Sequence, residues 1–401
     1  MQHSATPTVG SFALVGGFEA ITRGVTLSVF PLVLYRAWGD AAVVSQIYLA
    51  VGIVSLLTVL TVPWLMRVLP RRWVHTLGVL LYLGSAAFGM VGGKTVALAL
   101  LCTVVGTAIA FVCYNANILQ YVAKTELGRL ETLRLFYAGT GWAAGPFVGV
   151  WLLQYWHGAP FVVVAVSAGA MLFAIWWVGM GSTQRAPRTG TVSPNPLRYL
   201  RRFAVQPRLV GAWLLVVIRS CGWSVYLVYV GIYAIEEGLS DRIGGIAASL
   251  ASTGLFLAPL MLRWMRARPL RSTVQIGFFG AGACFVLAAL LAGWPWVSIA
   301  LLLAGAYFLV LLDLFGGLPF LMSVKPSERS EMSAVYSTFR DAANIVTPGA
   351  VWLVLQVGPL AAVFAVGGAG LLVAWWIAGR MHAELGVAPS ERRRATRRVS
   401  S

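Results

Sequence analysis

Residues 42–66 read AVVSQIYLAVGIVSLLTVLTVPWLM, and no charged side chain occurs among them. As a helix, this stretch is long enough to cross a hydrocarbon core about 30 Å thick. Comparable apolar runs recur along the whole chain. Division at the polar breaks gives twelve spans, near residues 10–35, 42–66, 74–93, 96–123, 132–155, 160–181, 209–235, 242–263, 273–292, 296–322, 332–356 and 359–380. The pattern therefore predicts an all-α membrane protein with twelve transmembrane helices.

The composition excludes an ordinary soluble globular protein. Hydrophobic residues make up 59% and charged residues 11% of the 401 residues, whereas charged residues are about 25% of a soluble domain. The first apolar run carries Glu19 and Arg23, and no small-residue cleavage site follows it. We therefore expect it to be a retained helix and not a signal peptide.

The cysteines and histidines carry no recognisable chemistry. All four cysteines lie inside apolar runs, without paired spacing and without a histidine beside them: Cys102, Cys113, Cys221 and Cys284. We expect neither a disulfide framework nor a metal site. The sequence also lacks a phosphate-binding glycine loop and a nucleophile elbow, so no cofactor and no enzymatic activity are predicted.

The net charge of +17 is distributed unevenly along the chain. Most of the basic residues fall in alternate polar breaks and in the tail, whereas the opposite breaks hold only Arg36, Lys94 and Arg242. An excess of arginine and lysine marks the cytoplasmic side of an inner-membrane protein, so both termini are predicted to be cytoplasmic. The surplus suits anionic lipid, above all at the basic tail 381–401, and gives no reason to expect nucleic-acid binding.

The longest cytoplasmic break, residues 182–208, contains four prolines and is predicted to be a linker between two halves. It separates a six-helix bundle at 1–181 from a second bundle at 209–380. The halves repeat features in the same order: Met66-Arg67 reappears as Met265-Arg266, and Trp176-Trp177 as Trp375-Trp376. Two parallel repeats of this kind place a substrate site at their interface, near the middle of the bilayer.

With these features the chain resembles the major facilitator superfamily from about residue 10 to residue 380. The resemblance implies a monomeric secondary transporter for a small solute. The family's loop between the second and third helices is matched by the basic residues Arg67, Arg71 and Arg72, which the resemblance implicates in gating. That loop here lacks the family's usual glycine and aspartate, so the charge relay assigned to the aspartate does not carry over.

The fifth span contains GWAAGPFVG at residues 141–149, which is similar to the antiporter motif of the family's exporters. Its small residues and proline are Gly141, Gly145, Pro146 and Gly149. Small residues at this spacing let two helices approach closely, and proline bends a helix. The motif therefore has two readings, an exporter motif and a simple packing seam.

Six charged residues fall deep inside predicted spans: Glu19, Arg23, Arg219, Asp313, Arg340 and Asp341. Charges in hydrocarbon are costly, so each is a hypothesis of function. At 1.5 Å per residue they lie in one layer near the middle of the bilayer. They are the predicted charge network for substrate and coupling ion.

The spacing of these charges suggests their partners. Glu19 and Arg23 are four residues apart and can pair, either as a fixed structural ion pair or as part of a coupling site. The simplest remaining arrangement pairs Arg340 with Asp313 and leaves Asp341 facing another helix or the cavity. Arg219 has no acid in its own span before Glu236, so it is predicted to contact either the substrate or one of the membrane acids.

Neutral polar and aromatic residues complete the predicted substrate site. Tyr114, Asn115 and Asn117 form a polar patch in the fourth span, with Gln120 beside them. They could hydrogen-bond a solute or bridge two helices. Trp223 and Tyr226, followed by Tyr229, lie at helical spacing in the seventh span, where they could form a cavity wall or pack against other helices.

The function predicted from the sequence is secondary active transport of a small organic solute, with proton-coupled efflux as the first reading. Without a nucleotide-binding motif the energy must come from an ion or solute gradient, and the three membrane acids can accept protons. Uptake or facilitated transport of an organic anion is the alternative within transport. A non-transporting assembly or sensor protein on the same fold is the alternative from another class, because fold does not determine function.

Overall fold

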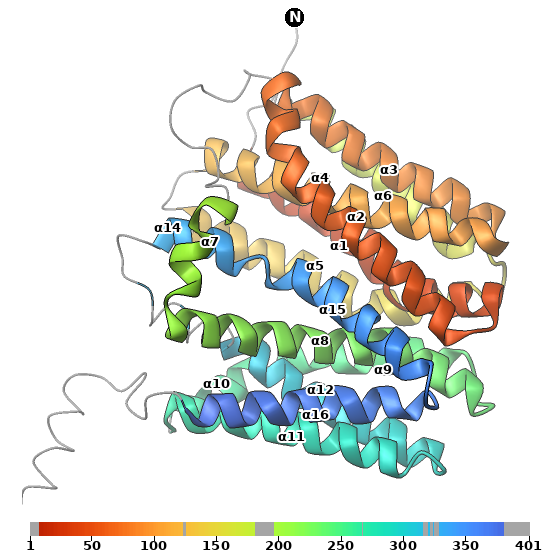
Figure 1. Ribbon diagram of the computed structural model, residues 1–401. Coiled ribbons are helices and arrows are strands. Elements are labelled where there is room, and N and C mark those ends of the chain that lie inside the picture. The colour runs from red at the N-terminus through yellow and green to blue at the C-terminus, as the bar shows by residue number, and fades with distance from the viewer. Residues whose placement is uncertain are drawn as a thin grey trace, which may run out of the picture. The chain divides into compact units, whose positions relative to one another are not determined.

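The computed structural model describes residues 8–122, 126–180, 196–266, 268–315, 320, 324 and 329–380. Every regular element among these residues is a helix, as predicted (Figure 1). The helices of the first half are α1 (Val9–Trp38), α2 (Ala41–Val68), α3 (Arg71–Val91), η1 (Gly93–Thr95), α4 (Val96–Tyr121), α5 (Leu127–Leu152) and α6 (Ala159–Trp177). Those that follow are α7 (Pro196–Ala204), α8 (Pro207–Glu236), α9 (Arg242–Thr253), η3 (Gly254–Leu257), α10 (Ala258–Arg266), α11 (Leu270–Leu290), α12 (Pro295–Phe315), α14 (Arg329–Tyr336), α15 (Phe339–Leu355) and α16 (Ala361–Gly379).

Among the described residues, ten helices are long and apolar enough to cross a membrane. The fifth predicted span corresponds to α5, whose first part carries Arg129, Glu131 and Arg134, and the eleventh to α14 and the 17-residue α15. The chain is thus a multi-pass helical membrane protein.

The turn between α1 and α2 illustrates how local sequence ends a span. Gly39 takes the left-handed conformation at the end of α1, with φ of 67°, and its N–H bonds to the Tyr35 carbonyl. Asp40 then caps α2, since its carboxylate accepts from the Ala42 N–H at 2.7 Å. A glycine stop followed at once by an acidic cap gives a two-residue connection.

Two predicted spans are not continuous helices. The span at 242–263 consists of α9, a 3₁₀ turn at η3 and then α10, which begins just before Pro259. Proline is tolerated in a first turn but breaks a helix interior, so the helix restarts there. The span at 332–356 is divided at Ser337 and Thr338, where the Thr338 hydroxyl donates to the Val335 carbonyl at 2.7 Å. Such a side-chain bond offers the backbone an alternative to continued helix.

The linker predicted at 182–208 contains a helix that the sequence analysis missed. α7 covers Pro196–Ala204 and ends in Arg201, Arg202 and Phe203. The Phe203 ring is buried, while the arginines are exposed. The four prolines of the segment suggested an extended linker, but proline at a first helical position favours a helix.

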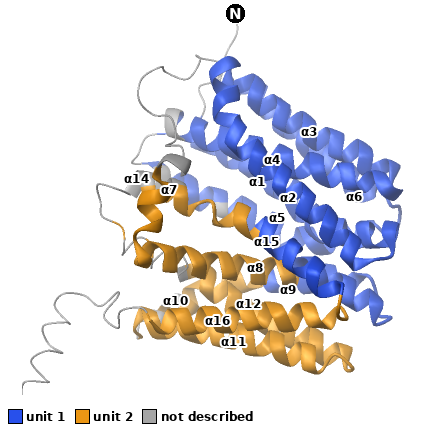
Figure 2. Cartoon of the chain, viewed as in Figure 1, with its two compact units in different colours: residues 1–193, 227–252, 344–356 blue, residues 194–226, 253–343, 357–401 orange. Residues whose placement is uncertain are grey.

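The chain forms two compact units that do not coincide with the two predicted bundles (Figure 2). Unit 1 contains residues 1–193, 227–252 and 344–356, and unit 2 contains residues 194–226, 253–343 and 357–401. The second part of α8, all of α9 and most of α15 therefore pack with the first six helices. The division into bundles at 1–181 and 209–380 stays a prediction.

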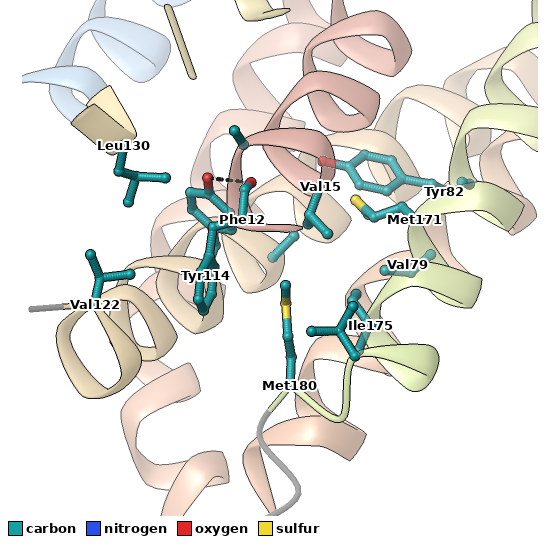
Figure 3. Packing of buried hydrophobic residues seen from close by; sticks show 14 residues of the cluster. Phe12, Val15, Val79, Tyr82, Tyr114, Val122, Leu130, Met171, Ile175 and Met180 are labelled. Carbon is teal, nitrogen blue, oxygen red and sulfur yellow. Dashed lines mark hydrogen bonds between the residues drawn. The ribbon is translucent and has the colours of Figure 1, made fainter. Parts of the chain in front are cut away.

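The core of unit 1 is built around the first part of α1 (Figure 3). Phe12 is fully buried, and the Tyr114 hydroxyl of α4 donates to the Phe12 carbonyl at 2.8 Å. Tyr82 of α3 and Met171 of α6 complete the cluster. Four helices thus converge on one short segment, which fixes the residues that follow it on α1.

In unit 2, α11 packs along α16 and α12. A second buried cluster joins α7 to the start of α8 and to α14, through Phe203, Leu209, Met332 and Val335. The Tyr336 ring stacks on Phe320 with a centroid distance of 4.1 Å. This cluster holds the end of α14 immediately before the break that leads to Phe339.

Candidate functional site

A carboxylate of unit 2, Asp313 on α12, is bound on both of its oxygen atoms. The Arg219 Nε lies 3.0 Å from Oδ1, and the Trp223 indole N–H donates to Oδ2 at 2.9 Å. Both partners come from α8 and are four residues apart, so they lie on the same face of that helix. One helix therefore supplies a charged donor and a neutral donor to a single acid.

Arg219 is held by more than this ion pair. Its side chain is 12% exposed, against 34% for Asp313. Its Nη1 donates to the Leu312 carbonyl at 3.3 Å, and its guanidinium lies 5.9 Å from the centre of the Phe339 ring. Arg219 is thus oriented from α8 toward the last turn of α12, and the less buried partner of the pair is the acid.

Asp313 has an ion-pair partner, Arg219, that its spacing along the chain did not identify, and the charge of Arg340 also acts on Asp313. The predicted pairing of Arg340 with Asp313 stays a prediction. Arg340 lies 5.5 Å from the centre of the Phe339 ring, and Asp341 occupies the first turn of α15. An acid in a first turn is stabilised by the helix dipole. Arg219 was not assigned to Asp313 because sequence spacing does not reveal which helix adjoins α12.

The second group of membrane charges lies in unit 1. Arg23 Nη1 is 3.5 Å from Glu19 Oε1, so the predicted pair on α1 is confirmed. The Glu19 side chain is 12% exposed and the Arg23 side chain 37%. The Arg23 guanidinium also lies 5.0 Å from the centre of the Trp142 ring on α5. As in unit 2, an acid is paired with an arginine beside a tryptophan.

Arg134 on α5 is a member of this group that the sequence analysis missed. Its Nε and Nη2 bind the two oxygens of Glu131 at 3.0 and 2.5 Å, and its charge also acts on Glu19. The signal that could have found it is the spacing of three residues from Glu131, which puts both on one helix face.

The residues of the polar patch predicted on α4 lie in different environments. Tyr114 is engaged by the core, and Asn115 donates to the Phe111 carbonyl of its own helix at 2.9 Å. Asn117 is fully buried, and neither its amide nitrogen nor its amide oxygen has a hydrogen-bond partner. The side chain of Gln120 lies outside the described residues. Among the side chains of this patch that the structure describes, only that of Asn117 has buried polar atoms without a hydrogen-bond partner.

Two of the aromatic residues predicted to line a cavity from the seventh span are fully buried. Tyr226 and Tyr229 are at most 1% exposed. Trp223 packs edge-on against Tyr226, with ring centres 6.1 Å apart. In unit 1 the Tyr229 hydroxyl bonds to the Ser45 hydroxyl of α2 at 2.8 Å. Trp223 is therefore the aromatic residue of this set that combines partial exposure with a polar contact to the charge pair.

The glycines of the exporter-like motif form a contact between α5 and α1. A Cβ atom added to Gly145 would lie 2.5 Å from the carbonyl carbon of Gly24, and one added to Gly141 would lie 2.9 Å from that of Ala20. One added to Gly149 would overlap the Val25 carbonyl oxygen. The structure thus gives this motif the geometry of a packing seam. Pro146 follows Gly145 inside α5, where it removes a backbone donor.

The three basic residues of the loop between α2 and α3 are not equivalent. Arg67 is exposed at the end of α2. Arg71 donates to the Ala116 carbonyl at 3.5 Å, and Arg72 donates to the Trp176 carbonyl at 2.9 Å. Arg71 therefore reaches α4 and Arg72 reaches α6.

A further polar cluster lies where α1 and α2 meet α8 and α9 within unit 1. Arg36 forms an ion pair with Asp241, and the Tyr35 hydroxyl donates to Glu236 Oε1 at 3.1 Å. The bond between Ser45 and Tyr229 lies about two turns before Glu236 on α8. None of these pairs was predicted, since the partners are separated by a large part of the chain.

Metal chemistry finds no support in the part of the chain that the structure describes. No group of three or more potential metal-ligating side chains occurs there. The four cysteines are free thiols. Together, the helices and the charge pairs describe a membrane-spanning protein with acids and bases inside its spans.

Comparison with known proteins identifies the family to which the chain belongs. Residues 12–348 match the Major Facilitator Superfamily. The chain therefore belongs to this superfamily, whose members are secondary transporters and not enzymes. A comparison of the sequence with curated proteins finds no match.

Solved structures of several transporters share the fold. A peptide transporter, POT, in complex with sulfate is 14% identical, with a TM-score of 0.72 over 94% of this chain and 96% of that one. The nucleoside transporter NupG is 12% identical, with a TM-score of 0.69 over 93% and 99%. A bacterial homologue of the iron transporter ferroportin is 16% identical, with a TM-score of 0.67 over 93% and 97%. At these identities the similarity shows a shared fold and does not identify a transported solute.

Proposed function

We propose that this chain is a proton-coupled exporter of a small organic solute in the inner membrane. In this proposal twelve helices form two six-helix repeats, residues 182–208 are a cytoplasmic linker, and both termini face the cytoplasm. The protein acts as a monomer and alternates access by moving one repeat against the other. The basic tail 381–401, which lies outside the described residues, contacts anionic lipid.

The observation that carries the proton coupling is the binding of Asp313 by both Arg219 and Trp223. The charged carboxylate satisfies the Arg219 guanidinium, whereas a protonated carboxyl leaves that guanidinium without its counterion. Loss of one charge from a membrane pair is costly. Protonation of Asp313 would therefore release Arg219 and alter the contact between α8 and α12, which is a means of linking proton binding to helix movement.

Glu19 offers a second proton site by the same argument, because it is paired with Arg23 and lies near Arg134. Asp341 is less suited, since the dipole of α15 already stabilises its charge. We assign the coupling role to Asp313 first and to Glu19 second. In unit 2 the solute would contact Trp223, whose ring is partly exposed and whose indole N–H is bonded to Asp313.

The direction of transport is proposed from the exporter-like motif at residues 141–149. The exporter-like motif has the geometry of a seam, and a seam is also compatible with uptake. The alternative of an organic-anion carrier needs Arg219 to bind the solute. Its guanidinium already contacts the Asp313 carboxylate and the Leu312 carbonyl, so we favour the role of counterion over that of anion receptor.

The test is solute-induced proton movement in proteoliposomes. The purified protein is first screened against anions, sugars and amphipathic amines by thermal shift at two pH values. The stabilising solutes are then added to proteoliposomes that hold a pH gradient and an interior pH dye. Collapse of the gradient by wild type but not by the Asp313→Asn variant supports the proposal. Solute transport that does not depend on the pH gradient would contradict proton coupling and indicate facilitated transport.

A further inference from the structure

Phe339, the first residue of α15, lies beside two arginines of the charge group in unit 2. The centre of its ring is 5.9 Å from the Arg219 guanidinium and 5.5 Å from that of Arg340. Both distances are within the range of a cation–π contact. Arg340 is the next residue along the chain, whereas Arg219 comes from α8. The ring therefore links the start of α15 to the arginine that binds Asp313.

The break between α14 and α15 sets the position of Phe339. The Thr338 hydroxyl donates to the Val335 carbonyl at 2.7 Å and accepts from the Trp213 indole N–H of α8 at 3.3 Å. The Thr338 carbonyl accepts from the Ala342 N–H at 2.9 Å, which is the first backbone bond of α15. One threonine thus ends α14, begins α15 and is tied to α8, immediately before Phe339.

The end of α14 supports the Phe339 ring from the other side of the break. The Tyr336 ring lies 5.7 Å from the Phe339 ring and stacks on Phe320 at 4.1 Å. Met332, one turn before Tyr336, belongs to the buried cluster of α7, α8 and α14. The charge of Arg219 also acts on the Tyr336 hydroxyl. A change in the position of Phe339 would therefore disturb a packed aromatic cluster.

The polar contacts of Arg219 are directed toward α12. Its Nε lies 3.0 Å from Asp313 Oδ1, and its Nη1 donates to the Leu312 carbonyl at 3.3 Å. A guanidinium is weakly hydrated and stacks on aromatic rings, so a ring can hold it without taking the N–H groups that the acid needs. A smaller aliphatic side chain at position 339 would leave Arg219 able to adopt other rotamers. The ring thus favours the orientation in which the ion pair forms.

We propose that Phe339 is a positioning residue that holds Arg219 against Asp313, and that the bond from Trp213 to Thr338 places its ring. The inference rests on the proposed role of Asp313 as the proton site, and it adds a group that sets how readily this acid takes up a proton. Without the ring the guanidinium stabilises the carboxylate less, so the carboxylate is protonated at higher pH.

The charged groups around Asp313 define what the titration reports. Arg219 acts on it from α8 and Arg340 acts on it from α15. Arg340 acts in turn on Asp341, its neighbour in the first turn of α15. Replacement of Phe339 leaves all four charges in the chain. A changed titration of Asp313 in that variant therefore reports the placement of the arginines and not their number.

The test is an infrared pH titration of the full-length protein in lipid vesicles. The protonated carboxyl of Asp313 gives a C=O stretching band, which is assigned by its absence from the Asp313→Asn variant. Phe339→Leu should move the midpoint of this band to higher pH by about half a pH unit, the size expected for a lost cation–π contact. Phe339→Tyr keeps an aromatic face and should retain the midpoint of wild type.

Phe285→Leu is the matched control, because it removes a fully buried ring from α11 in the same unit. No arginine lies over that ring among the residues that the structure describes, so the midpoint should not change. An unchanged midpoint in Phe339→Leu, or equal shifts in both variants, would overturn the proposal. If Phe339→Leu does not fold, Trp213→Phe removes the N–H that binds Thr338 and should shift the midpoint in the same direction.

A thermal double-mutant cycle decides the outcome if the Asp313 band does not titrate. Phe339→Leu should lower the melting temperature less in the Arg219→Gln protein than in wild type, and additive losses would overturn the proposal. The cycle and the titration also separate this proposal from the proposed function. Proton-coupled transport with an unshifted midpoint would remove the role of Phe339 alone. Transport that does not depend on the pH gradient, with the expected shift, would remove proton coupling and keep that role.

Discussion

Asp313 shows how a carboxylate can be retained inside a membrane helix. Arg219 supplies a charge and Trp223 supplies a neutral donor, each to a different oxygen. A hydrogen-bonded, charge-paired acid avoids most of the cost of an isolated ion. The acid is the less buried partner, at 34% exposed against 12% for its arginine.

The pairing predicts a specific double-mutant result. Asp313→Asn should destabilise the protein, because it strands the Arg219 charge at a cost of about 3 to 5 kcal/mol by analogy with soluble cores. Adding Arg219→Gln should recover part of that loss, whereas adding Arg340→Gln should recover less. Thermal unfolding in detergent measures each combination. Strictly additive losses for Asp313 and Arg219 would contradict the ion pair.

Substitution of Arg219 separates a counterion from a substrate receptor. If Arg219 only balances Asp313, Arg219→Lys should keep the solute affinity of wild type, since the positive charge is retained. Arg219→Gln should abolish proton-driven transport in a protein that still folds. Solute binding by calorimetry and gradient-driven flux give the two readouts. A folded Arg219→Lys protein with strongly weakened affinity for an anionic solute would instead support direct contact, because lysine lacks the bidentate fork.

At the scale of elements, α1 and α5 pack closely along a seam of glycines. Gly24 on α1 meets Gly141 and Gly145 on α5 without intervening side chains. In a bilayer, where lipid tails are as apolar as the helices, such contacts are stabilised by close packing. The charge groups on both helices, Glu19 with Arg23 and Glu131 with Arg134, adjoin this seam. Its integrity therefore affects their alignment.

Two glycines of α5 provide a matched test of the seam. Gly145→Ala should destabilise the protein by about 1 to 3 kcal/mol, because the added methyl group overlaps the backbone of α1 at Gly24. Gly139→Ala should have no such cost, since nothing lies within 4 Å of its added Cβ. Alanine's better helix propensity should even stabilise it slightly. Melting temperatures of the two variants in detergent compare them, and equal shifts would refute the seam.

At the scale of the whole chain, orientation in the membrane can be tested independently of transport. Basic residues crowd alternate polar breaks, while Arg36, Lys94 and Arg242 stand on the other side. We expect an alkaline phosphatase fusion after Ser401 to be inactive and one inserted near Gly238 to be active, since the enzyme requires export. Green fluorescent protein at the same positions should give the inverse pattern. A reversed result at either position would remove the twelve-span topology.

The contacts of α1 and α2 with α8 and α9 give a further prediction for the whole chain. Arg36 and Asp241 are paired, and Tyr35 binds Glu236. Asp241→Asn leaves Arg36 without its partner and should loosen this end of unit 1. Labelling of a cysteine introduced at Gln46 by a membrane-impermeant maleimide should then become faster. Asp40→Asn, which removes a nearby acidic charge but keeps the helix cap and leaves the pair of Arg36 with Asp241 in place, serves as the control. Equal rates in both variants would contradict the role of the pair.

The sequence by itself determined what depends on local composition. Apolar runs and glycine or proline breaks located most of the spans to within a few residues, and the spacing of four residues identified the pair of Glu19 with Arg23. These inferences succeed because helix length and contacts one turn apart follow from the chain's own geometry. Only the tertiary structure decided which distant residues meet. It paired Asp313 with Arg219, brought Arg134 toward Glu19, and folded α7 within the linker. Those contacts depend on which helices adjoin one another and how each is rotated, and neither is encoded in the spacing along a single helix.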